Sequence, residues 1–226
     1  MQRHNIFNQI HKGLRALLFD TALHLQRTDF TNEVEAEEAL NKVREAVLLF
    51  DEHAQKEDAF VLPAIAEFEP SVVATFQAEH VKDMALSNQL TASVETFFLQ
   101  DAPAQKILAG QQLTRSFMAF TVFNLEHMAK EEDLVNTILW RYYSDEVILG
   151  MQQEIVRNTT PWLNDFFSKW MLRGINTAEA TSWLQAVQAT APDVVFQTLL
   201  NKAAEELPGA RFERIASALA DGVPTA

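Results

Sequence analysis

The sequence predicts an all-α protein, and two observations support this class. Only 6 glycines and 7 prolines occur in 226 residues, so turns are few and the elements between them must be long. Apolar residues recur every three or four positions over most of the chain, as they do along the buried face of a helix. We therefore expect an up-down-up-down four-helix bundle that is followed by a C-terminal segment of short helices.

Four long segments with helical periodicity account for the bundle. Their expected ranges are about 5–27, 32–68, 70–101 and 103–143. Asn32 and Glu35 resemble a capping box at the start of the second segment. Pro63 lies within that segment and is expected to kink its last turns. The breaks between segments are very short, so neighbouring helices should run antiparallel.

The rest of the chain has shorter and better punctuated helices. Asn176 and Glu179 form a second candidate capping box, and several prolines mark further helix starts. We expect two domains. Residues 1–143 form the bundle, and residues 144–226 form a helical extension that packs on the bundle or on a partner.

Charge and cysteine content exclude several classes of function. The net charge of −13 repels nucleic acids and anionic membranes at long range. Without cysteine, the chain cannot form disulfides, use a thiolate nucleophile or bind a metal through sulfur from cysteine. No apolar run approaches the length of a membrane span, and no signal-peptide core follows the first residues. A cytoplasmic protein is the expectation.

Two of the six histidines are followed by a glutamate four residues later: His53 by Glu57, and His127 by Glu131. Residues i and i+4 lie on one face of a helix, so each pair directs an imidazole and a carboxylate the same way. One pair lies in the second helix and the other in the fourth. In a bundle, both pairs can therefore offer metal ligands to the interior.

The first and third helices each add one histidine, His11 and His80. The chain thus contains two helical hairpins, and each carries a histidine followed by a His-x-x-x-Glu pair. Pairing the hairpins about a pseudo-twofold axis brings four histidines and two glutamates together. This set suits two metal ions, each with two histidines, bridged by two carboxylates.

Apolar residues at helical spacing flank these positions, among them Leu134 beside Glu131 and Met84 beside His80. A buried carboxylate without a partner costs several kcal/mol, so two of them in one core require cations. Arg15 lies on the same face, but one arginine pairs with one glutamate and leaves four histidines unexplained. Metal ions explain the set better than two exposed helical pairs do.

The remaining candidates have other expected roles. His4 lies two turns before the first ligand and could substitute for one, although a surface position is expected; His24 faces elsewhere. Asp58 and Glu132 each follow a ligand glutamate by one residue, so they turn away from the metal and lie behind the ligands or in solvent. Asn124 could orient a ligand histidine through a hydrogen bond.

Four segments carry a resemblance to a known family: Ile10–Arg15, Phe50–Asp58, Glu79-His80 and Leu125–Glu132. Over residues 5–142 the chain resembles the hemerythrin-like HHE cation-binding domains. The resemblance implies a non-haem di-iron site in which two carboxylates, Glu57 and Glu131, bridge the ions. Its implied ligands are His11, His53, Glu57, His80, His127 and Glu131. Mn or Zn could substitute for Fe.

One feature departs from the oxygen-carrying hemerythrins, which place two histidines four residues apart on the third helix. Here the positions four residues from His80 are Phe76 and Met84, so the fifth histidine is missing. Two more symmetric irons with exchangeable positions are therefore expected. This pattern resembles the iron-repair and nitrosative-stress members of the family more than an oxygen carrier.

Three functions follow from these observations. The first is a di-iron protein that binds or senses O2 or NO, or that senses iron or redox state. The second is a di-iron enzyme that acts on peroxide or NO or repairs iron centres; no residue beyond the ligands is identified as a catalytic acid or base, so enzymatic activity stays open. The third is a metal-free helical adaptor.

An aromatic stripe at helical spacing lies in the C-terminal segment and consists of Trp162, Phe166 and Trp170. We expect it to dock on the bundle or to form a homodimer surface.

Overall fold

The computed structural model describes residues 3–221, and within this range it contains helices and no strand. The all-α prediction is confirmed. The chain divides into two compact units: one holds the residues up to Asn8 together with Leu17–Thr160, and the other holds Gln9–Ala16 together with the chain from Pro161. The predicted boundary between residues 143 and 144 stays a prediction. No helix in the described range is long and apolar enough to cross a membrane.

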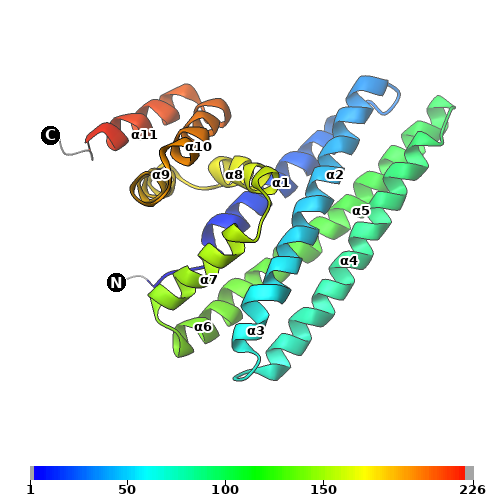
Figure 1. Ribbon diagram of the computed structural model, residues 1–226. Helices are drawn as coiled ribbons and strands as arrows, with labels where there is room; N and C mark the ends of the chain where they lie inside the picture. Colours follow the sequence, from blue (N-terminus) through cyan, green and yellow to red (C-terminus); the bar gives the residue numbers. More distant parts are fainter. Residues whose placement is uncertain (1–2, 222–226) are drawn as a thin grey trace. The chain divides into compact units, whose positions relative to one another are not determined.

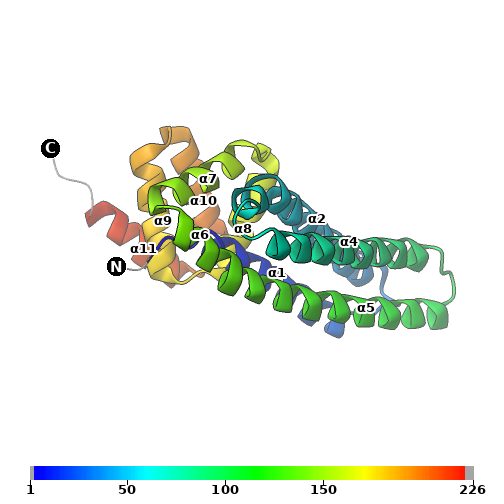
Figure 2. The same cartoon turned by 90° about the horizontal axis from the view of Figure 1, so that it is seen from below.

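Long antiparallel helices build the first unit (Figure 1). Its elements are α1 (Asn8–Arg27, from Leu17 onward), α2 (Glu33–Lys56), η1 (Glu57–Val61), α3 (Leu62–Ile65), α4 (Pro70–Phe98), α5 (Pro103–Lys130), η2 (Glu131–Val135), α6 (Asn136–Tyr142) and α7 (Asp145–Arg157). α4 packs against both α2 and α5. Figures 1 and 2 both show the α4–α5 connection at the end of the bundle opposite α3 and α6.

Local chemistry explains where these helices begin. The Asn32 side chain accepts hydrogen bonds from the N–H groups of Val34 and Glu35 and so caps α2. Pro70 and Pro103 occupy the first turn of α4 and α5, where the missing N–H is not needed. The first helix begins at residue 8 rather than residue 5, and the second helical region ends at residue 65 rather than 68.

Two short π-helical segments interrupt the bundle, one in each half of the repeat. η1 begins at Glu57 and η2 begins at Glu131, the two predicted bridging ligands. The order of elements in the first half, α1–α2–η1–α3, therefore recurs as α4–α5–η2–α6. The irregularity expected at Pro63 is this π turn, and Pro63 itself lies in the first turn of α3. Such segments occur frequently at functional sites.

Two sets of buried apolar residues lie along the first unit. The set around α3, α6 and α7 includes Phe7, Ile65 and Ile148, all fully buried. The second set includes Phe50 and Phe120, whose rings meet edge to face with centroids 5.2 Å apart. Burial of these large side chains is the main driving force for forming the bundle.

The second unit has its own apolar core. It consists of α8 (Pro161–Gly174), α9 (Thr177–Thr190), α10 (Asp193–Glu206) and α11 (Gly209–Asp221), with the segment 9–16 of α1. The capping box predicted at Asn176 and Glu179 is present. Gly13 allows a close approach of backbones, because a Cβ there would lie 2.8 Å from the Met171 nitrogen. Trp170 is buried, whereas Trp162 is 51% exposed.

Replacing Gly110 by alanine should destabilise the first unit. Gly110 is buried on α5, and a Cβ there would lie 2.2 Å from the Phe30 ring. The overlap should outweigh the better helix propensity of alanine and lower the free energy of unfolding by about 1–3 kcal/mol. The control is Gly150→Ala on α7, where no atom lies within 4 Å of the added methyl group. That change should raise stability by about 0.5–1 kcal/mol in urea denaturation. Equal effects of the two changes would contradict the packing seen around Gly110.

Candidate metal centre

All six predicted ligands are buried, with exposed fractions between 0 and 8%. They form two groups in which one ligand atom from each residue lies within 4.8 Å of every other. The groups are His11, His53, Glu57 and Glu131, and Glu57, His80, His127 and Glu131. Both groups contain the same two glutamates. The arrangement therefore offers two neighbouring cation positions with two shared carboxylates.

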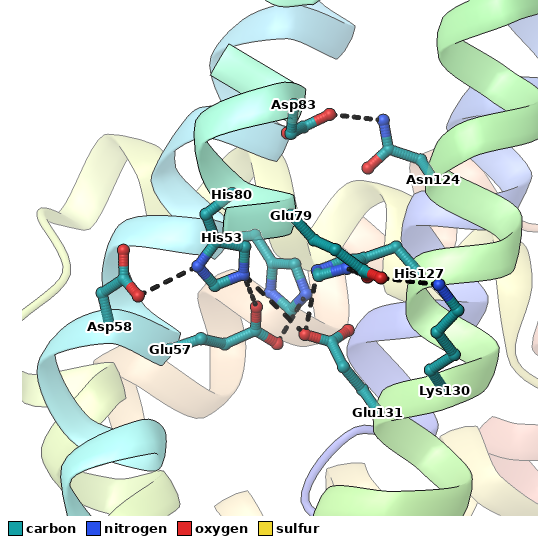
Figure 3. A network of polar contacts seen from close by, with 10 residues as sticks. All are labelled: His53, Glu57, Asp58, Glu79, His80, Asp83, Asn124, His127, Lys130 and Glu131. Carbon is teal, nitrogen blue, oxygen red and sulfur yellow. Dashed lines mark hydrogen bonds and ion pairs between the residues drawn. The ribbon is translucent and has the colours of Figure 1, made fainter. Parts of the chain in front are cut away.

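The Nε2 atoms of three histidines face these carboxylates (Figure 3). His53 Nε2 lies 3.0 Å from Glu57 Oε1, and His127 Nε2 lies 3.1 Å from Glu131 Oε1. His80 Nε2 faces both glutamates, at 3.4 Å from Glu57 Oε2 and 4.0 Å from Glu131 Oε1. The i,i+4 spacing therefore places each imidazole beside its carboxylate, as the sequence predicts.

Two further carboxylates hold the outer edges of the imidazoles. His80 Nδ1 lies 2.9 Å from Asp58 Oδ1, and His127 Nδ1 lies 2.7 Å from Glu79 Oε2. Lys130 Nζ donates to the other oxygen of Glu79 at 2.6 Å. An Nδ1–H that donates to a carboxylate fixes the ring and leaves the Nε2 lone pair for a cation. The expected position of Asp58 behind the ligands agrees with this contact. The role of Glu79 was not predicted, because its contact with His127 depends on how α4 packs against α5.

Electrostatics show that this interior attracts positive charge. Burial alone would lower the pKa of His80, but the adjacent carboxylates of Glu57 and Asp58 raise it to about 9. Without a metal, a proton on His80 therefore offsets part of the negative charge at neutral pH. Burial alone would raise the pKa of Glu79, but hydrogen bonds from His127 and Lys130 bring it below its usual range.

A second buried polar pair lies one helical turn away. Asn124 Nδ2 donates to Asp83 Oδ1 at 2.7 Å and to the Phe120 carbonyl at 3.2 Å. The sequence suggested that Asn124 could orient a ligand histidine. Instead, its side chain contacts Asp83. Burial raises the pKa of Asp83 to about 6. No sequence pattern singled out Asp83, because its role depends on the register between α4 and α5.

The structure corrects two predicted neighbours of the ligands. Leu134 is 50% exposed and Met84 is 60% exposed, so neither is among the buried apolar residues that flank the ligands. Leu134 lies within η2, where the extra residue of the π turn moves the buried positions to Val135 and Asn136. Helix α4 has no such insertion; Met84 simply lies on its outer face.

The other histidines lie outside both groups among the described residues. His4 Nε2 is 2.7 Å from Gln152 Oε1 and is occupied by that contact. His24 lies in the last turn of α1. Neither takes the place of a fifth histidine ligand within these two groups.

The chemistry of the donors fits metal ions. Imidazole nitrogen with carboxylate oxygen suits Fe, Mn and Zn. His80 Nε2 is buried and makes no hydrogen bond within the described part of the chain. Its lone pair or proton points into the space between the two glutamates. A cation shared by these donors would satisfy this nitrogen and neutralise charge that burial otherwise makes costly.

Comparisons with known proteins agree with this chemistry. The family model for the hemerythrin HHE cation binding domain matches residues 3–139. F-box/LRR-repeat protein 5 of Danio rerio is 24% identical over 153 residues, which cover 67% of this chain. The matched region spans only 22% of that relative. No solved structure matches the chain significantly.

Replacing Glu79 by glutamine should weaken metal binding without removing a ligand. The variant no longer holds His127 Nδ1 through a charged acceptor, and such changes typically lower affinity about 10–100-fold. Affinity for Zn²⁺ can be measured by competition with a chromophoric chelator. Glu126→Gln is the matched control, because this exposed residue lies one position before His127 and contacts neither ring nitrogen in the described structure. An equal loss in both variants would show that general surface charge, rather than the His127 contact, sets the affinity.

The pKa of His80 predicts how the metal-free protein responds to pH. The folded pKa of about 9 exceeds the unfolded value of 6.5, so the stabilisation is complete below pH 6.5 and is lost as pH rises to 9. The loss should be about 3 kcal/mol for a shift of this size. Chemical denaturation with chelator present, from pH 6 to 10, measures it, and His80→Gln should flatten this part of the profile.

Bound metal should respond to pH in the opposite direction. Protons compete with metal for imidazole, so the excess melting temperature of the metal-loaded form should shrink from pH 8 to pH 5. Circular dichroism with and without chelator tests this comparison. Identical melting temperatures at pH 8 would mean that the two groups hold no metal.

Proposed function

This chain belongs to the hemerythrin HHE cation-binding family, and we propose that it is a non-haem di-iron protein that binds or senses O2 or NO, or senses iron or redox state. The observation that carries the proposal is the pair of overlapping ligand groups with two shared glutamates. A single mononuclear site would not require two groups. Two neighbouring ions bridged by carboxylates use all six residues.

In this proposal, His11 and His53 serve one ion and His80 and His127 serve the other. Glu57 and Glu131 belong to both groups and act as the bridges. Six protein ligands shared between two ions would leave room on each ion for an exchangeable ligand. Bound iron would supply the electrons and the open positions through which a diatomic molecule is held.

The residues of the chain supply the surroundings. The buried apolar sets that include Phe50 and Ile65 limit access of water to the ligands. The carboxylates of Asp58 and Glu79 fix two of the imidazoles. A dry site with fixed ligands favours binding of a small neutral molecule and disfavours hydrolytic loss of the metal.

An enzymatic role at the same centre is the second candidate. It would involve turnover of peroxide or NO, or repair of iron centres. The observation in its favour is Asp83, a buried carboxyl group near the ligands that can exchange a proton close to neutral pH. Steady-state assays with peroxide or NO would distinguish turnover from reversible binding.

Metal analysis of protein from iron-replete cells tests the proposal directly. We expect two irons per chain and charge-transfer absorption in the near ultraviolet or visible range. His53→Ala and His127→Ala should each remove one iron and weaken the other, because the bridging glutamates couple the two positions. Elemental analysis together with absorption spectra provides the measurement.

His24→Ala is the control for these variants. His24 lies on α1 outside both ligand groups, so its loss should leave two irons per chain. Fewer than one metal per wild-type chain, or iron at two per chain without charge-transfer absorption, would contradict a di-iron centre. Loss of iron in His24→Ala but not in His80→Ala would contradict the ligand assignment.

A further inference from the structure

One buried carboxyl group beside the metal centre is not among the ligands. Asp83 lies on α4 three residues after His80 and is 3% exposed. It accepts a hydrogen bond from Asn124 Nδ2, and no ion pair links it to a lysine or arginine of the described chain. Asn124 precedes His127 by three residues on α5. Figure 3 shows this pair further along α4 and α5 than His80 and His127, with no contact drawn to Glu57 or Glu131.

The internal repeat of the chain shows that packing does not require this polar pair. In the first half, the residue three positions after the α1 ligand is Leu14, and the residue three positions before the α2 ligand is Phe50. Both are buried. Asp83 and Asn124 take the corresponding positions in the second half. A buried carboxyl group where the other half has leucine costs stability, so packing alone does not explain Asp83.

We propose that Asp83 is the proton-exchanging residue of the metal centre. When a cation binds to His80 and His127, the O–H bond of the Asp83 carboxyl group breaks, the carboxylate stays in place and the proton passes to solvent. When the cation leaves, the carboxylate takes up a proton again. The inference rests on the proposed metal centre and adds a residue that regulates cation binding without being a ligand.

The charges around Asp83 support this coupling. Burial raises the pKa of Asp83 to about 6, the hydrogen bond from Asn124 and the positive charges of His127 and His80 oppose that shift, and Asp51 on α2 adds to it. Asp83 makes no hydrogen bond or ion pair to either histidine within the described chain. A doubly charged cation on those histidines brings more positive charge than their protons do, and so favours the ionised carboxylate.

Counting the protons released during zinc binding tests the proposal. Isothermal titration of full-length, metal-free protein with Zn²⁺ in two buffers of different ionisation enthalpy gives this number. With a pKa of about 6, about three quarters of the Asp83 carboxyl groups are protonated at pH 5.5, so wild-type protein should release about 0.75 proton per chain more than Asp83→Asn. At pH 8 the two should release equal numbers, because the Asp83 carboxyl group is already ionised there.

Asp133→Asn is the matched control, since it removes a carboxylate from an exposed position in η2. It should release as many protons as wild type at both pH values. The double variant Asp83→Leu/Asn124→Phe copies the apolar pair of the first half and should show the same loss as Asp83→Asn. If Asp83→Asn does not fold, the double variant still allows the proton count to be compared with that of wild type.

The outcomes separate this inference from the proposed function. Equal proton release by wild type and both Asp83 variants at pH 5.5, with zinc bound, would overturn the role of Asp83 and leave the metal centre intact. An equal loss in Asp133→Asn would also overturn it, because the effect would then be one of total charge. Absence of zinc binding to wild-type protein at pH 8 would instead remove the metal centre itself, and this inference with it.

Discussion

The structure depends on the burial of two carboxylates in an apolar helical bundle. Glu57 and Glu131 are 3% and 1% exposed, and both belong to each of the two ligand groups. Removing one carboxylate from water costs several kcal/mol, and a second one nearby adds repulsion. The interior must therefore hold positive charge, either as protons on imidazole or as metal ions. The histidines, and the carboxylates that hold their outer nitrogens, are arranged around this requirement.

The two π-helical segments belong to the same arrangement. In η1 the Leu62 N–H bonds to the Glu57 carbonyl, and in η2 the Asn136 N–H bonds to the Glu131 carbonyl. A proline follows η1 closely, but no proline follows η2, so proline is not the common cause. What the two segments share is the glutamate at which they begin. The inserted residue rotates the following turn by about 100° and so buries two consecutive residues beyond each ligand.

Local patterns made part of this architecture predictable from sequence. The pairs His53–Glu57 and His127–Glu131 depend only on the helical repeat, so their shared direction can be read directly. The π insertions could not be predicted, because the hydrophobic pattern does not show to which carbonyl a backbone N–H will bond. For this reason Leu134 was expected to be buried, although it is exposed. The partners of His127 and Asn124 on α4 depend on the register between two helices. The division inside α1 likewise depends on tertiary contacts that periodicity does not contain.

The repeat that duplicates the ligands does not duplicate their surroundings. Glu79 and Asp83 both lie near His80 and His127, and Glu79 bonds directly to the His127 imidazole. Asp58 has an acidic counterpart in the repeat, Glu132, so it does not distinguish the two halves. In the first half, the positions that correspond to Glu79 and Asp83 are Ile10 and Leu14. Negative charge stabilises a nearby cation in proportion to that cation's charge. Two ion positions with matching ligands would therefore favour ions of different charge. The carboxylates near His80 and His127 would favour the more positively charged ion there.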